Sequence, residues 1–107
     1  MKKILYIVST LQNSGPTNQL YNIISHLDLS RFKPYVLTLS KEPLDGSSRW
    51  ANYEKLGIKL HSLELSRAKG LIFGKKAVMN FISAIKPDLI HTQGIRADAI
   101  ISSLKPN

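Results

Sequence analysis

The feature that most constrains this chain is the alternation of short apolar runs with longer segments of helical period. The first run is continuous, with β-branched, aliphatic and aromatic side chains, as expected for a strand covered on both faces. The helical segments show apolar spacing of three and four residues or helix-capping signals. Strand signals lie at residues 4–8, 35–39, 58–63 and 88–92, and helix signals at residues 16–27, 47–56, 71–85 and 95–104.

The resulting element order is βαβαβαβα, and it predicts the fold class. Because parallel neighbours need a crossover connection, this order gives a parallel sheet with helices on both faces. We therefore expect an α/β, Rossmann-like, doubly wound sheet with strand order 3-2-1-4. The length suits one domain, residues 1–107. A fifth strand would begin near Asn107, so we expect an incomplete N-terminal domain; a complete small α/β protein is the alternative.

Individual residues mark the ends of the expected helices. Pro16 suits the first helical position, where its missing N–H costs nothing. Ser47 or Ser48 is expected to cap the second helix, and Gly57 is expected to end it. The buried face of the first helix is predicted to consist of Leu20, Ile23, Ile24 and Leu27.

Composition excludes several classes of protein. The chain has no cysteine, which excludes a disulfide scaffold and a thiolate zinc site. No stretch approaches the roughly 18 apolar residues of a membrane helix. The apolar run after Lys3 is shorter than the roughly 7–15 residues of a secretion signal, so a buried first strand is favoured. We expect a cytoplasmic protein. The net charge of +8 favours anionic partners such as phosphates, anionic lipid or nucleic acid.

The strand order places a candidate ligand site between the first and fourth strands. Ligands of open α/β sheets bind at the carboxyl ends of the strands where the order reverses. The loop after the first strand, residues 9–17, opens a helix whose N-terminal amides favour an anion. Gly15 would let the backbone approach a ligand. A simple βα turn is the alternative for this loop, whose candidate binding residues are Ser14, Gly15, Pro16 and Thr17.

The loop after the fourth strand supplies the other candidates. His91 follows two apolar residues and is a candidate base or hydrogen-bond donor to a ligand hydroxyl; a histidine satisfied by the backbone is the alternative. Gln93 has the same strand parity and is expected on the same side. Gly94 belongs to the same loop, and Arg96 lies in the first turn of the last expected helix, where a cation suits an anionic ligand or solvent.

The remaining polar residues predict no metal site, because the three histidines lack metal-ligand spacing. A basic patch surrounds the apolar residues 71–73, without an acidic residue between Ser66 and Lys76. Such a patch can seat a segment on anionic lipid, and a solvated helix face is the alternative. Its members are Arg67, Lys69, Lys75 and Lys76. No nucleic-acid-binding motif is present, so we expect no nucleic-acid partner.

Three segments together resemble the N-terminal domain of family 4 glycosyltransferases, which have the GT-B fold of two Rossmann-like domains facing a cleft. They are KILYIVS at residues 3–9, SGPTNQL at 14–20 and KPDLIHTQG at 86–94. The chain departs from the family pattern twice. Ser14 stands where the family often has the first of two glycines, and Gln93 stands where it often has a second histidine.

The resemblance implies a retaining transfer of a sugar from a nucleotide-sugar to a lipid-linked or polysaccharide acceptor. It assigns this chain to the acceptor side and the nucleotide to a second domain, and it implies no metal or other cofactor. The basic patch then favours a peripheral position on the inner face of a membrane. A non-enzymatic, flavodoxin-like binding or regulatory domain remains as the alternative function, and a basic nucleic-acid-binding module is a further rival.

Overall fold

The first apolar run forms a strand inside the sheet, β1 (Lys2–Val8). In the computed structural model, which describes residues 2–65 and 67–93, β1 pairs in parallel with β2 (Phe32–Ser40) and with β4 (Leu89–Thr92). The remaining strand of the described sheet, β3 (Lys59–Leu65), pairs in parallel with β2. The observed order, β3-β2-β1-β4, confirms the predicted α/β class and the predicted 3-2-1-4 order of a Rossmann-like sheet.

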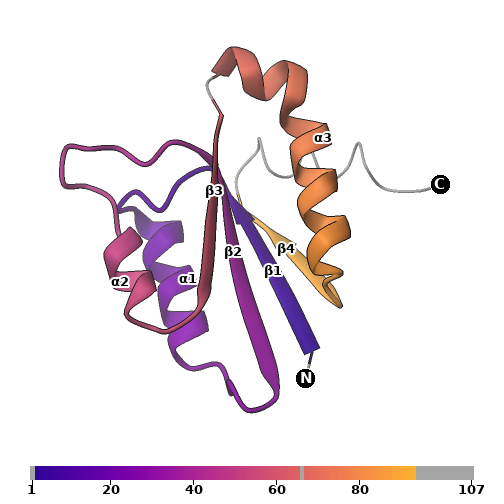
Figure 1. Cartoon of the computed structure of the whole chain (residues 1–107). Coiled ribbons are helices and arrows are strands. Elements are labelled where there is room, and N and C mark those ends of the chain that lie inside the picture. Colours follow the sequence, from indigo (N-terminus) through magenta and orange to yellow (C-terminus); the bar gives the residue numbers. More distant parts are fainter. Residues whose placement is uncertain (1, 66, 94–107) are drawn as a thin grey trace.

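Helices cover both faces of the sheet (Figure 1). The helices α1 (Gly15–Ser25) and α2 (Trp50–Glu54) lie on one face, and α3 (Arg67–Ile85) lies on the other. Alternate residues of β1 point to opposite faces, so the strand contributes to two apolar clusters. The buried members of the cluster under α1 and α2 are Ile4, Tyr6, Val8, Leu11, Leu20, Ile24, Val36 and Tyr53. The buried members of the cluster under α3 are Leu5, Ile7, Tyr35, Leu37, Leu39 and Val78.

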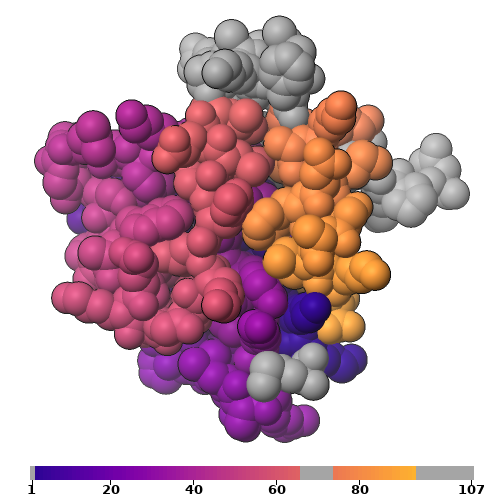
Figure 2. Space-filling view, viewed as in Figure 1, coloured from indigo at the N-terminus to yellow at the C-terminus, as the bar shows by residue number. Residues whose placement is uncertain are grey.

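The elements around β1 cover most of this strand. On the face shown in Figure 2, α3 (orange) lies beside the segment from α2 through β3 (magenta to red), and little of β1 (indigo) can be seen. Residues 4–8 are all buried, as the continuous apolar run predicted.

The helix α1 begins one residue earlier than expected. Its N-cap is Ser14, whose hydroxyl accepts a hydrogen bond from the Thr17 amide, so Pro16 occupies the second helical position. Its buried side is also narrower than predicted. Leu20 and Ile24 are buried with Thr17, whereas Ile23 is 45% exposed.

The prediction for α2 was wrong in its length and in its cap. The helix has only five residues, and its N-cap is Arg49, without a side-chain cap. The two predicted caps have other roles. The Ser47 hydroxyl donates to Asp45, and the Ser48 hydroxyl, one residue before the N-cap, donates to Glu42 and accepts from the Trp50 amide at 3.1 Å. Gly57 does lie just past the helix, with a positive φ of 76°, as a residue that ends a helix should.

The remaining boundaries shift by a few residues. The strand β3 starts one residue later than expected and ends two residues later, and α3 starts four residues earlier, because its polar first turn lacks the apolar spacing that marked the rest. The strand β4 begins at Leu89, one residue after the expected start. The helix predicted for residues 95–104 lies outside the described residues.

We expect the buried ring and hydroxyl of Tyr53 to hold α2 onto α1. The side chain is fully buried, and its hydroxyl donates to the Thr17 carbonyl. Burial raises the pKa of this phenol well above its usual range, so it remains a donor. Tyr53→Phe should lower the free energy of unfolding by about 0.5–1.5 kcal/mol, and Tyr53→Ala by about 3–5 kcal/mol, in urea titrations. Equal stability of the phenylalanine variant and the parent would contradict a role for the hydroxyl.

Candidate functional site

A pocket of about 230 Å³ lies at the point where the strand order reverses. The predicted loops meet here: the loop after β1 supplies most of the lining, and Gln93 supplies the wall that follows β4. Both strands are parallel, so their carboxyl ends reach the same edge of the sheet. The described lining residues are Val8, Ser9, Thr10, Gln12, Ser14, Pro16, Thr17 and Gln93. The structure therefore brings together four of the sequence-predicted binding residues.

The N-terminus of α1 offers fewer donors than a helix end usually does. Pro16 has no N–H, and the Thr17 amide is bonded to the Ser14 hydroxyl at 3.3 Å. Gly15 therefore supplies the first-turn amide best suited to an anion. A Cβ built on Gly15 would meet nothing within 4 Å in the described structure, so close approach of the backbone to another group does not require glycine there.

His91 and Gln93 lie on the same face of the sheet, as their parity predicted. His91 pairs with Tyr6, which faces α1, and the two rings are 5.6 Å apart. Burial raises the pKa of the Tyr6 phenol, so the neighbour of the imidazole is neutral. His91 is exposed and is not among the described lining residues of the pocket, whereas Gln93 is. The backbone amide of Gln93 donates to the Ile7 carbonyl at 2.9 Å, and this bond fixes the position of Gln93 just beyond β4.

Other predicted residues are placed only in part. Gly94 and Arg96 lie outside the described residues. The backbone of Arg67 and Lys69 belongs to the first turn of α3, while their side chains also lie outside the described part. Lys75 and Lys76 are exposed on α3, where an anionic surface can reach them.

Nothing in the sequence marks Glu42, the residue that holds the loop after β1 in place. The Glu42 carboxylate accepts hydrogen bonds from the Leu11 amide, at 3.0 and 3.1 Å, and from the Ser48 hydroxyl, at 2.5 Å. It thus ties the loop after β1 to the segment before α2. Two backbone bonds of 2.7 Å join the same segments, from Asn13 to Ser47 and from Arg49 to Leu11.

A second, wider pocket of about 430 Å³ lies on the other side of this connection. It is at the carboxyl ends of β2 and β3, and Gln12 of the first pocket forms a β-bridge with Ser48 of the second. Trp50 and Glu64 contribute to its wall, and Glu64 has a positive φ of 50°. The edge of the sheet therefore carries two neighbouring pockets.

No metal centre is apparent in the described part of the chain, where no group of three potential His, Asp or Glu ligands comes together. Among residues 2–65 and 67–93, no helix has the length and apolar content needed to cross a membrane. Comparison with protein families, with curated proteins and with solved structures finds no match to this chain.

We predict that Glu42→Ala destabilises the fold through the loop after β1. Hydrogen bonds to a charged group typically contribute about 1.5–3 kcal/mol, so a loss of that order is expected in urea unfolding. The Leu11 amide should also exchange faster with solvent. Glu54→Ala removes an exposed carboxylate from α2 and serves as the matched control. An unchanged exchange rate of the Leu11 amide in the Glu42 variant would contradict a stabilising role for the bonds between Glu42 and Leu11.

The basic patch predicts salt-sensitive binding to anionic vesicles. Each lysine near an anionic surface contributes about 1 kcal/mol, so Lys75→Gln with Lys76→Gln should weaken vesicle binding about 30-fold in co-sedimentation. Lys55→Gln with Lys59→Gln removes two exposed lysines elsewhere as a control. Equal partitioning onto neutral and anionic vesicles would show that the patch is only a solvated helix face.

Proposed function

We propose that this chain is the acceptor-side, N-terminal domain of a retaining glycosyltransferase of the GT-B type. The observation that carries the proposal is the pocket where the strand order reverses, which has polar side chains on both sides, Ser14 and Thr17 on one and Gln93 on the other. Hydroxyl and amide groups both donate and accept hydrogen bonds, which suits the hydroxyls of a sugar. All three of the segments that resemble the family contribute residues to the lining of this pocket.

In the proposed reaction a sugar leaves a nucleoside diphosphate and is bonded to a hydroxyl of the acceptor. The bond between the anomeric carbon and the diphosphate breaks, and the acceptor hydroxyl loses its proton. The contribution of this chain is to hold and orient the acceptor. The side-chain carboxamide of Gln93 and the Ser14 hydroxyl are the proposed contacts to the acceptor. The backbone amide of Gly15 suits an acceptor phosphate. His91 is the proposed base or hydrogen-bond donor.

The proposed partners follow from this division of labour. The nucleotide-sugar donor would be held by a second domain, and the acceptor would be a lipid-linked or polysaccharide glycan. The exposed Lys75 and Lys76 support a peripheral position at an anionic, cytoplasmic membrane surface, where a lipid-linked acceptor is found.

Nuclear magnetic resonance titrations of the labelled chain test this function. Glucose, mannose and their disaccharides should shift the side-chain amide signal of Gln93, and the corresponding nucleotide-sugars should bind no more tightly. Gln93→Ala should weaken disaccharide binding about threefold to tenfold, the loss expected for one neutral hydrogen bond. His91→Ala should weaken it as well without changing the unfolding transition.

Gln19→Ala is the matched control, because Gln19 is exposed on α1 and is not among the described lining residues of this pocket. Micromolar binding of a nucleotide-sugar, with no shift from any free sugar, would overturn the acceptor-side assignment. Tight binding of a flavin or nucleotide alone would favour the flavodoxin-like alternative, and salt-dependent DNA binding would favour the nucleic-acid rival.

A further inference from the structure

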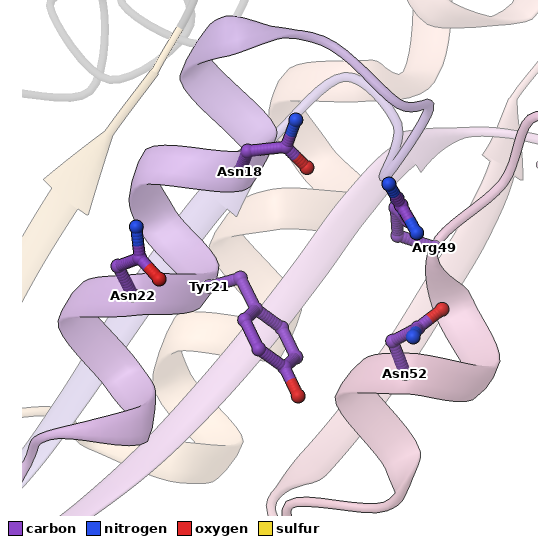
Figure 3. A pocket seen from close by; sticks show the side chains of 5 residues that line it. All are labelled: Asn18, Tyr21, Asn22, Arg49 and Asn52. Carbon is purple, nitrogen blue, oxygen red and sulfur yellow. The ribbon is translucent and has the colours of Figure 1, made fainter.

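A further groove with a polar lining lies between α1 and α2, away from the pocket between the loops after β1 and β4. Its volume is about 270 Å³, and it shares no described lining residue with that pocket. Figure 3 shows Asn18 and Tyr21 of α1 pointing across the gap toward Arg49 and Asn52. Asn22, one turn after Asn18, completes the described lining. The groove is thus formed by three carboxamides, one phenol and one guanidinium.

The guanidinium of Arg49 is the unusual member of this set. Its Nε is buried and has no hydrogen-bond partner in the part of the chain that the structure describes. Buried polar atoms are almost always paired, and an unpaired one is unfavourable, more so on a charged group. An acceptor in the groove that bonds the guanidinium would offset part of this penalty. None of the described lining residues is acidic, so this lining carries one positive charge and no carboxylate to balance it.

The chemistry of the lining defines the ligand. A guanidinium presents paired donors in a plane, which match the oxygens of a carboxylate or phosphate. The surrounding carboxamides donate and accept, as the hydroxyls of a sugar require. Asn18 donates to the Asn13 side chain at 3.0 Å, which leaves its oxygen as an acceptor for a ligand hydroxyl. The volume, slightly below the roughly 300–1,000 Å³ of common ligand sites, suits a single small unit.

We propose that this groove binds a small acidic carbohydrate, with its carboxylate or phosphate on Arg49 and its hydroxyls on Asn18, Asn22 and Asn52. The proposal adds a second ligand site and does not depend on transferase activity. A sugar unit with a carboxylate and one with a phosphate share the required chemistry, and the two are separated by the experiment below.

The walls of the groove are held in place before any ligand arrives. The Arg49 amide donates to the Leu11 carbonyl at 2.7 Å, and Ser48 next to it is bonded to Glu42. Tyr21 packs edge-on against the buried ring of Tyr53, with ring centres 5.4 Å apart. Because these contacts fix the backbone of α2 relative to α1, little free energy is lost in ordering the walls when a ligand binds.

Titration of the labelled chain with four small molecules tests the proposal. Glucuronate and glucose 6-phosphate carry the two anionic groups, glucose carries none, and inorganic phosphate lacks the ring. At least one acidic sugar should shift the side-chain amide signals of Asn18 and Asn52 at millimolar concentration, and glucose should bind about tenfold more weakly or not at all. The better of the two acidic sugars identifies the anion.

Variants separate this groove from general charge attraction. Arg49→Gln should weaken binding of the acidic sugar about tenfold or more, while Lys55→Gln, which removes an exposed positive charge elsewhere on the chain, should change it less than about twofold. Asn52→Ala provides a second test if Arg49→Gln unfolds. Three outcomes would overturn the proposal: no shift at Asn18 and Asn52 with either acidic sugar, binding of glucose as tight as that of the better acidic sugar, or equal losses in the Arg49 and Lys55 variants.

Discussion

Burial of the apolar run at residues 4–8 on both faces of the sheet determines where the rest of the molecule lies. A strand that must be covered on two sides needs helices on both, and parallel pairing with β2 and β4 provides the crossovers that carry them. Since β1 lies where the strand order reverses, the same constraint creates the crevice at its carboxyl end. The candidate site is therefore a consequence of the most hydrophobic segment in the chain.

The strand order alone does not fix the loop after β1, and hydrogen bonds from residues far along the chain hold this loop in place. Glu42 is separated from Leu11 by 31 positions, yet its carboxylate holds that amide and the Ser48 hydroxyl together. The short backbone bridge between Gln12 and Ser48 continues the connection. Polar groups that are fully bonded to one another form a rigid wall, and a rigid wall can present Ser14 and Gln93 to a ligand in a fixed geometry.

The sequence predicted the parts of the fold that depend on periodicity and failed where specific side-chain contacts decide. Strand order and class followed from the apolar runs, and the approach of Ser14 and Thr17 to Gln93 followed from topology. The cap of α2 did not, because Arg49 is the N-cap. Ser47 is bonded to Asp45, and Ser48, bonded to Glu42, accepts from the Trp50 amide one residue before the cap. Ile23 has the spacing of a core residue but is 45% exposed, because the buried stripe of α1 runs through Thr17, Leu20 and Ile24. Nothing local marks Glu42 or Arg49 as special, since their importance comes from segments far away in the chain.

The helix α1 links the two proposed ligand sites, because its first turn faces the crevice and its flank faces α2. Thr17 lines the crevice pocket, and its carbonyl accepts the hydroxyl of Tyr53 from α2. Asn18, the next residue, lines the groove that Arg49 closes from the other side. A shift of α2 along α1 would therefore change the groove directly and the crevice through Thr17. Because the contact between Tyr53 and Thr17 is buried, such a shift would strain the core, so the fold favours one fixed geometry for both sites.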